Sequence, residues 1–266
     1  MSEKYILEGQ GLRKEFGGLV AVADVDIRVR QGELHSIIGP NGAGKTTLFN
    51  LLTGNLRPTR GTVRFRDQDI TLAPLYRRVH LGIGRSFQVT NIFPNLSVLE
   101  NVRLAAQARG GDSFKFWWNY QRFKKYNAVA LQAIEQAGLH DRAHVPAAIL
   151  PHGDKRKLEL AILLASDAEI LLLDEPTAGM ATEQVPALIE TIRRIQQAGD
   201  KTIMLVEHNM NVVMNISDRI TVMHQGEVLA EGTPAEITRN ETVQKAYLGE
   251  LYGDFAEIIQ GQGGVA

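Results

Sequence analysis

The chain contains no cysteine among its 266 residues. This absence excludes disulfide bonds and thiolate chemistry, and it is compatible with a reducing compartment. No run of about 18 uncharged apolar residues occurs, so the sequence predicts no membrane-spanning segment. The first five residues lack the apolar core of a signal peptide. The net charge of −1 gives no overall basic field that would favour nucleic acid. Any role at a membrane therefore requires a partner.

What is present is an ordinary globular composition, with 44% hydrophobic and 22% charged residues. A chain of this length suffices for one large α/β domain or two small lobes. Short apolar runs alternate with turn signals over the first 70 residues or so, whereas residues 91–150 carry helical patterns with few β-branched runs. The pattern therefore predicts a mostly helical lobe inserted into an α/β core. The predicted strands are 25–29, 34–38, 62–65, 170–174, 201–206, and a hairpin of 219–224 with 227–231; a helix is predicted over about 183–198.

Residues 39–46 read Gly-Pro-Asn-Gly-Ala-Gly-Lys-Thr, a complete G-x-x-x-x-G-K-T phosphate-binding pattern. It follows the apolar, β-branched run 34–38 and precedes the helical run 47–52, which is the context that the pattern requires. The glycines let backbone N–H groups turn inward around a polyphosphate, and the helix N-terminus adds positive potential. Lys45 would then reach the β- and γ-phosphates, and the Thr46 hydroxyl would bind Mg²⁺. The alternative, a glycine turn that merely precedes Lys-Thr, is disfavoured by the flanking strand and helix.

Polar residues follow two further buried strands. Asp174 and Glu175 come after four apolar residues, and the carboxyl ends of strands are where open α/β sheets place functional groups. Asp174 would hold Mg²⁺ through water, and Glu175 would orient or deprotonate the attacking water; the alternative is an exposed acidic turn before Pro176. His208 also ends a strand and would bond the γ-phosphate or the water, although a lone histidine is more often structural. Gln88, just before the helical lobe, is a weak signal by itself, but an amide can ligate Mg²⁺.

Together these residues resemble the nucleotide-binding subunit of an ABC transporter, over about residues 5–250. The matching segments are Gly39–Thr46 (Walker A), Gln88 (Q-loop), Leu150–Gly153 (signature), Leu171–Glu175 (Walker B) and His208 (switch histidine). The resemblance implies an α/β fold: a P-loop NTPase (RecA-like) core with an N-terminal antiparallel β subdomain and an inserted α-helical subdomain. The ABC ATPase domain is expected over 1–252, with the core at about 1–90 and 154–252, the helical subdomain at about 91–153, and a flexible tail at 253–266.

The resemblance also implies a role for each matching residue. Lys45, Glu175 and His208 are expected to serve ATP hydrolysis, and Phe16 is expected to stack on adenine unless it is a core phenylalanine. Contacts to ATP are expected from Phe16, Asn41, Gly42, Ala43, Gly44, Lys45, Thr46, Thr47 and Gln88. The expected Mg²⁺ ligands are Thr46, Gln88 and Asp174, and the signature residues that act on a partner's ATP are Pro151, His152 and Gly153.

Within the superfamily, the chain is most similar to ATP-binding subunits of branched-chain amino-acid importers; urea or short-chain amide importers share much of the pattern. The stretches that carry this similarity are 17–22, 51–54, 85–88, 91–93, 98–102 and 246–249. The similarity implies a peripheral ATPase on the cytoplasmic face of the inner or plasma membrane. Its implied partners are transmembrane permease subunits, a second ATPase subunit that is either a copy or a paralogue, and indirectly a solute-binding protein. No nucleic-acid partner is implied.

Two positions depart from the family pattern. The signature L-S-G-G-Q reads Leu150-Pro151-His152-Gly153-Asp154, so the serine hydroxyl is missing at Pro151, although Gly153 and a helix N-terminus from about Lys155 remain available to a phosphate. Ala181 stands where many members have an aspartate. Both positions act across the dimer in this family, and Pro151 favours a paralogous mate that supplies the better signature.

Residues 114–126 hold an aromatic and basic run that includes both tryptophans. Phe116, Tyr120 and Phe123 have the spacing of one helix face, which favours an amphipathic helix packed on its own lobe. The alternatives are a surface near the membrane-embedded partner and a single-stranded nucleic-acid site.

Two other functions compete for the whole chain. One is a non-transport ABC protein in DNA repair or on ribosomes, and the other is a regulatory module without turnover. The single cassette without a long heptad run disfavours the first, and intact Asp174, Glu175 and His208 disfavour the second.

Overall fold

The computed structural model describes residues 4–86, 92–109 and 120–247. The chain divides into two compact units, one formed by Met1–Arg78 with Thr202–Ala266 and the other by Val79–Lys201. The helical subdomain expected at 91–153 lies within the second unit, but its boundaries stay a prediction. In the described parts of the chain, no helix is long and apolar enough to cross a bilayer.

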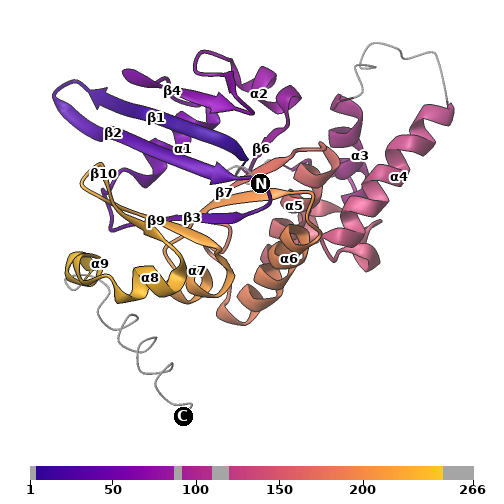
Figure 1. The fold of residues 1–266 in the computed structure, drawn as a ribbon. Coiled ribbons are helices and arrows are strands. Elements are labelled where there is room, and N and C mark those ends of the chain that lie inside the picture. The colour runs from indigo at the N-terminus through magenta and orange to yellow at the C-terminus, as the bar shows by residue number, and fades with distance from the viewer. Residues whose placement is uncertain (1–3, 87–91, 110–119, 248–266) are drawn as a thin grey trace. The chain divides into compact units, whose positions relative to one another are not determined.

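The first unit begins with an antiparallel sheet whose strand order is β2-β1-β4-β5 (Figure 1). Its strands are β1 (Tyr5–Phe16), β2 (Leu19–Arg30), β4 (Arg60–Phe65) and β5 (Gln68–Asp69). The β1–β2 turn uses Gly17 at φ 59°, a backbone conformation that favours glycine. This sheet is the expected antiparallel part of an α/β fold.

The first unit also contributes four strands to a mixed sheet. They are β3 (Leu34–Ile38), β8 (Thr202–Val206), β9 (Arg219–His224) and β10 (Glu227–Gly232). Strand β3 runs parallel to β8 and to β9, and β10 returns antiparallel to β9. Every residue of β3 and β8 is buried, including the polar His35 and Ser36 of β3, so neither strand alternates buried with exposed residues. Helix α1 (Lys45–Thr53) contacts β1 and β2 as well as β8, so it lies between the two sheets (Figure 1).

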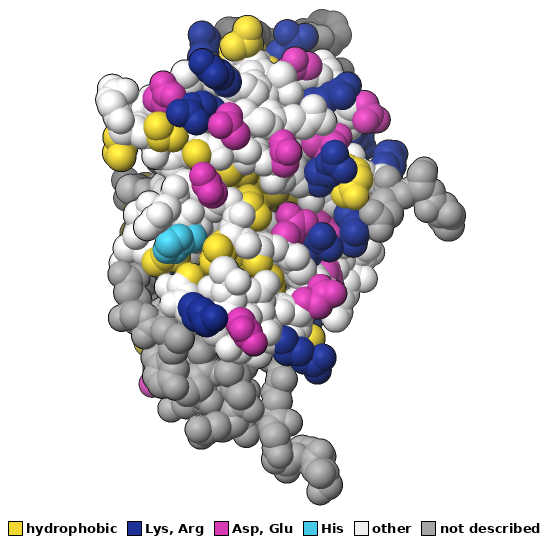
Figure 2. All heavy atoms as spheres, turned by 60° about the vertical axis from the view of Figure 1, so that its left-hand side comes forward, with side chains coloured by type: hydrophobic (Ala, Val, Ile, Leu, Met, Phe, Trp, Pro, Cys, Tyr) yellow, Lys and Arg dark blue, Asp and Glu magenta, His cyan; other side chains and the backbone are white. Residues whose placement is uncertain are grey.

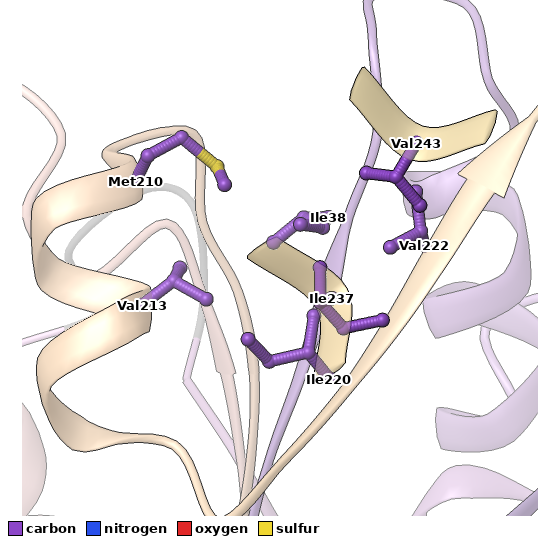
Figure 3. Packing of buried hydrophobic residues seen from close by; sticks show 7 residues of the cluster. All are labelled: Ile38, Met210, Val213, Ile220, Val222, Ile237 and Val243. Carbon is purple, nitrogen blue, oxygen red and sulfur yellow. The ribbon is translucent and has the colours of Figure 1, made fainter. Parts of the chain in front are cut away.

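Three short helices cover β9 on the side away from α1. They are α7 (Met210–Ile216), α8 (Pro234–Arg239) and α9 (Glu241–Tyr247). Figure 3 shows Met210 and Val213 of α7, Ile237 of α8 and Val243 of α9 directed toward the strands. The strands supply Ile38, Ile220 and Val222 to the same buried cluster. Helix α8 has six residues, and a reciprocal capping box between Thr233 and Glu236 fixes its start.

A buried arginine joins the end of α1 to the segment before α2 (Leu75–Leu81). The guanidinium of Arg78 donates hydrogen bonds to the backbone carbonyls of Leu52 (2.7 Å), Ile70 (2.7 Å), Thr71 (3.1 Å) and Ala73 (3.1 Å). Burial lowers the pKa of Arg78 to about 10, with the negative charge of Asp69 opposing the shift, so the side chain stays charged at neutral pH. A Cβ on Gly54, at the end of α1, would lie 2.5 Å from its Nε.

The second unit pairs two parallel strands with a group of helices. Strand β6 (Ile83–Arg85) runs beside β7 (Ile170–Asp174), and α3, α4 and α5 pack on one another. The helices are α3 (Val98–Arg109), α4 (Tyr120–Gln136), α5 (His152–Ala165) and α6 (Val185–Gln197), with short 3₁₀ turns at His140–Arg142, Ala147–Ile149 and Thr182–Gln184. The α/β class, the helical character of 91–150 and the helix near 183–198 are thereby confirmed.

In this unit, one sequence expectation is corrected and another is left untested. Helix α5 begins at His152, three residues earlier than the predicted start at Lys155, because Pro151 adopts φ −55° and ψ 157° as its N-cap and leads directly into the first turn. The prediction for the aromatic run is not tested. Residues 114–119 and the side chains of Tyr120 and Phe123 lie outside the described residues, so the face predicted for Phe116, Tyr120 and Phe123 stays a prediction.

Candidate functional site

The glycine loop between β3 and α1 has the backbone shape of an anion cradle. Gly39, Gly42 and Gly44 have φ of 156°, 78° and 94°, and α1 begins directly afterwards at Lys45. Leu48 bonds back to the carbonyl of Gly44 at 2.8 Å. The first turn of a helix presents N–H groups that have no partner within the helix, and these groups attract a phosphate.

Glycine is required at two of these positions because backbone atoms of other segments come very close. A Cβ on Gly39 would lie 2.3 Å from the carbonyl oxygen of Met223, and one on Gly44 would lie 2.4 Å from that of Ala21. The loop is therefore enclosed by β2 and β9, and larger residues would displace it.

Gly226, in the β9–β10 turn, holds the loop from outside. Its N–H donates to the carbonyl of Ala43 at 3.0 Å, and its own carbonyl accepts from the N–H of Ala23 at 2.8 Å. Sequence reasoning recognised Gln225-Gly226 only as a hairpin turn, because the contact joins segments far apart in the chain.

Lys45 lies within the loop rather than in solvent. Its Nζ donates to the carbonyls of Gly39 at 2.6 Å and Pro40 at 2.9 Å, and the side chain is buried. The loop carbonyls thus hold the ammonium in the loop that the phosphate-binding pattern assigns to a polyphosphate. A bound γ-phosphate would compete for the Lys45 ammonium, because a phosphate oxygen is a stronger hydrogen-bond acceptor than a neutral carbonyl.

Phe16 and His208 are the other predicted residues of the first unit, and both are exposed. Phe16 ends β1 with 46% of its surface accessible, and the Lys14 ammonium lies 5.1 Å from the ring centroid. A side chain this exposed is not part of the core, and its stacking on adenine stays a prediction. His208 lies two residues after the end of β8, and its backbone N–H donates to the buried Glu207 carboxylate at 3.2 Å. The next residue, Asn209, caps α7.

In the second unit, Asp174 ends β7 with only 2% of its surface accessible. Its backbone N–H donates to the Ser86 hydroxyl at 3.1 Å, and Nη2 of Arg85 lies 3.6 Å from its Oδ2. Burial lowers the pKa of the Arg85 guanidinium, and the charge of Asp174 opposes that shift. Sequence reasoning used Arg85 and Ser86 only as a family stretch and missed these contacts. Gln88, two residues further on, lies outside the described residues.

Glu175 has a left-handed backbone with φ of 47°. A non-glycine residue in this region is uncommon and strained, and such strain persists where the surrounding structure fixes it, often at functional sites. The Glu175 carbonyl accepts from the N–H of Ala178 at 3.0 Å, which forms the turn after β7. The strand end and this turn therefore fix the direction of the Glu175 backbone.

The altered signature forms the start of α5. Pro151 is the N-cap, and no side chain bonds to the first turn at this cap. A Cβ on the buried Gly153 would lie 3.1 Å from Oε1 of Gln184 and 3.4 Å from Cε of Met180. The absence of a side chain at Gly153 therefore lets the 180–184 segment pack closely against the start of α5. On the same side, a Cβ on Gly179 would lie 3.7 Å from the exposed His152 ring. The two segments that depart from the family pattern thus lie side by side, a contact that sequence reasoning did not predict.

Comparison with known proteins decides the family. The profile described as "ABC transporter" matches residues 22–178. The chain belongs to the ABC transporter family. A second profile, described as "Branched-chain amino acid ATP-binding cassette transporter", matches residues 227–252 of this ABC protein.

Relatives and solved structures agree with this assignment. The ABC protein is 41% identical over 251 residues to the high-affinity branched-chain amino acid transport ATP-binding protein LivG of Salmonella typhimurium, covering 92% of this chain and 98% of LivG. It is 38% identical over 250 residues to the high-affinity branched-chain amino acid transport ATP-binding protein BraF of Pseudomonas aeruginosa, covering 92% of this chain and 98% of BraF. The crystal structure of an ATP-binding cassette of an ABC transporter in its ADP conformation has a TM-score of 0.80 at 29% identity, covering 92% of this chain and 99% of that one. The predicted P-loop NTPase core is thereby confirmed.

The side chains of this ABC protein suit a metal that is held largely by its nucleotide. Among the described residues, no group of three or more histidines and carboxylates is arranged to hold an ion. Mg²⁺ in nucleotide sites needs only one or two protein oxygens besides phosphate and water. Each unit, taken by itself, offers one oxygen of this kind: the Thr46 hydroxyl in the first turn of α1, and the buried Asp174 carboxylate at the end of β7. Both donor types suit Mg²⁺.

Proposed function

We propose that this ABC protein binds ATP with Mg²⁺ and hydrolyses it to energise the import of branched-chain or other amino acids. The observation that carries the proposal is the glycine cradle of residues 39–46, with Lys45 held inside it and α1 beginning at its end. The names of LivG and BraF support branched-chain amino acids over urea or short-chain amides as the cargo class.

Each predicted residue has a part in this proposal. N–H groups of the loop from Asn41 through Thr47, together with the Lys45 ammonium, bind the phosphates and neutralise charge on the transferred phosphoryl. Thr46, Asp174 and Gln88 hold Mg²⁺, which adds positive charge at the phosphates when bound. Glu175 orients the attacking water and accepts its proton, and His208 bonds the γ-phosphate. Phe16 stacks on adenine.

The other half of each ATP site comes from a second ATPase subunit in this proposal. Pro151, His152 and Gly153 face the partner's nucleotide with the backbone N–H groups of the first turn of α5. Since Pro151 has no hydroxyl to donate, we infer that the mate is a paralogue with a serine in its signature rather than a second copy. The assembly is peripheral on the cytoplasmic face of the membrane, docked on permease subunits that receive cargo from a solute-binding protein.

Hydrolysis is tested with Glu175→Gln, which keeps the shape of the side chain and removes its basicity. This variant should bind ATP as the wild type does and turn over at least about tenfold more slowly, because the water loses its base. Lys45→Ala should instead lose ATP binding, since the loop loses its charge. Glu190→Gln, an exposed glutamate of α6, is the matched control with unchanged turnover. Wild-type turnover in Glu175→Gln would refute the assigned role.

The transport part of the proposal is tested by purification of the tagged chain from solubilised membranes. We expect polytopic membrane subunits to be recovered with it, and the reconstituted complex to import a branched-chain amino acid only with ATP. Recovery of ribosomes or DNA instead would contradict the proposal.

A further inference from the structure

The aromatic ring of Phe16 carries a positive charge over one of its two faces. Residues two apart in a strand share a face of the sheet, and the Lys14 ammonium accordingly lies over the Phe16 ring, 5.1 Å from its centroid. Phe16 is 46% exposed with this contact in place. A flat ligand that stacks on Phe16 while the ammonium stays there must therefore use the opposite face.

The Lys14 ammonium is held over the ring by a second contact. Its Nζ donates a hydrogen bond to the backbone carbonyl of Arg57 at 3.0 Å. Lys14 is partly buried, whereas lysine side chains are mostly exposed in proteins. The ring and the carbonyl together fix the position of the charge.

The carbonyl that anchors Lys14 belongs to a segment that is itself fixed on β1. The N–H of Thr59 donates to the carbonyl of Arg13 at 2.7 Å, and the N–H of Glu15 donates to the Thr59 hydroxyl at 3.1 Å. Residues 57–59 follow α1, the helix that begins at the phosphate-binding loop. The place of the Lys14 ammonium is therefore tied to the chain that leaves this helix.

Two carboxylates of the β1–β2 hairpin are engaged by a different cation. Nε of Arg13 donates to Oε1 of Glu15 at 2.7 Å, and Nη1 of Arg13 donates to Oδ2 of Asp24 at 3.1 Å. These pairs leave the charge of Lys14 directed at the Phe16 ring and the Arg57 carbonyl.

The Phe16 ring and the phosphate-binding loop meet along one short stretch of β2. Phe16 pairs with Leu19 across the β1–β2 turn. Ala21 follows two residues later, and its carbonyl oxygen would lie 2.4 Å from a Cβ on Gly44 of the loop. An exposed ring next to a phosphate cradle is the arrangement that a base and its phosphates need. All of these residues belong to the first unit.

We propose that Lys14 is a positioning residue for the nucleotide, which occupies one face of Phe16 and presents the other face to the base. A cation over an aromatic ring is attracted by the negative charge of the ring face and partly balances it. The opposite face then repels the electron-rich face of a purine less. A ring that is already held also loses less freedom when the base stacks. This inference rests on the proposed stacking of adenine on Phe16.

Calorimetric titration of the full chain with β,γ-imido-ATP and Mg²⁺ tests the proposal. Lys14→Met keeps the long side chain without its charge and should bind the analogue about two- to fivefold more weakly, the range that an exposed cation–π contact supports. Lys14→Arg keeps a cation over the ring and should restore most of the affinity. Equal melting temperatures of the variants and the wild type verify that they are folded.

Arg28→Met is the matched control for the loss of a cation over a ring. The Arg28 guanidinium lies over Tyr5, 5.6 Å from the ring centroid, at the other end of β1. This variant should bind the analogue as the wild type does. Equal affinities of Lys14→Met and Arg28→Met overturn the proposal.

Inorganic tripolyphosphate separates an effect on the base from an effect on the phosphates. It has three phosphates and no base, so Lys14→Met should bind it as tightly as the wild type. An equal loss for tripolyphosphate and for β,γ-imido-ATP would make Lys14 a phosphate ligand and overturn the proposal. In the complex with its partner subunits, Lys14→Met should raise KM for ATP without lowering kcat, because the base does not change during hydrolysis. A fall in kcat at unchanged KM contradicts the positioning role.

A double-mutant cycle shows whether Lys14 acts through the Phe16 ring. Phe16→Ala should weaken binding of β,γ-imido-ATP, and Lys14→Met should cause no further loss in that background. The same loss from Lys14→Met with and without the ring overturns the proposal.

These variants also distinguish a failure of this inference from a failure of the proposed stacking. Weaker binding in Phe16→Ala together with unchanged binding in Lys14→Met refutes the role of Lys14 alone. Unchanged binding in Phe16→Ala refutes the stacking of adenine, and the inference about Lys14 fails with it.

Discussion

Arg78 is the residue whose contribution to stability follows most directly from its contacts. Its charge is buried, and four backbone carbonyls around it accept its hydrogen bonds. Removing one partner from a buried, charged network is strongly destabilising, because the groups left behind stay buried without hydrogen-bond partners. This loss is larger than the stability that the intact network adds over an apolar core of the same size.

We therefore predict that Arg78→Ala lowers the free energy of unfolding by about 3–5 kcal/mol. Lys at this position keeps the charge but reaches fewer of the carbonyls, so Arg78→Lys should recover only part of the loss. The neighbouring Arg77 is exposed, and Arg77→Ala should stay within about 0.5 kcal/mol of the wild type. Urea unfolding followed by circular dichroism measures all three, and equal midpoints for the two alanine variants would contradict the prediction.

At the residue scale, the sequence located the strand and helix ends that carry the candidate residues, while the roles of those residues stay predictions. The glycine loop, the carboxylates at the end of 170–174 and the histidine after 202–206 are local patterns, so their places follow from the neighbouring strand or helix. The contacts of Gly226 and Arg85 were not predictable, because each depends on backbone packing between segments distant in the chain. The exposure of Phe16 likewise follows from its place at a strand end and not from its type.

At the scale of elements, strands buried on both faces were predictable because they are continuous apolar runs. The start of α5 was not, because Pro-His-Gly is a poor helix sequence. The structure resolves this by using Pro151 as the cap and by burying Gly153 against the 180–184 segment, so tertiary packing outweighs propensity.

The same cap gives a prediction about the signature. In Pro151→Ser a hydroxyl would cap α5, stabilising it by about 0.5–2 kcal/mol, while loss of proline would cost about 0.4–1 kcal/mol through the unfolded chain. These terms nearly cancel, so thermal stability should change little. Turnover of the dimer should nevertheless rise by at least about threefold, because the hydroxyl can donate to the partner's phosphate. Pro151→Ala removes proline without adding a hydroxyl and should show no gain; a gain in both variants would assign the effect to the backbone.

At the scale of the whole molecule, the charge distribution agrees with the near-neutral composition. On the face shown in Figure 2, basic side chains are interspersed with acidic ones, and no broad basic area appears among its coloured atoms. Nucleic-acid binding would need such an area. What the sequence could not give at this scale is a cavity among α3, α4 and α5, since a hollow depends on how three helices meet and not on the pattern of any one of them.

The last prediction concerns how ligand binding changes the stability of the entire chain. A ligand that binds only the folded state at 100 times its Kd stabilises it by about 2.7 kcal/mol, which for a chain of this size is about 5–10 °C in Tm. Glu175→Gln with ATP and Mg²⁺ should show this rise by differential scanning fluorimetry, because the nucleotide is not consumed. The rise should disappear with EDTA if Thr46 and Asp174 bind the metal together with ATP, and it should be absent in Lys45→Ala. If two chains close around the nucleotide, the rise should also increase with protein concentration, since dimerisation follows mass action. A rise that persists in Lys45→Ala would place the nucleotide outside the glycine loop and contradict the assignment.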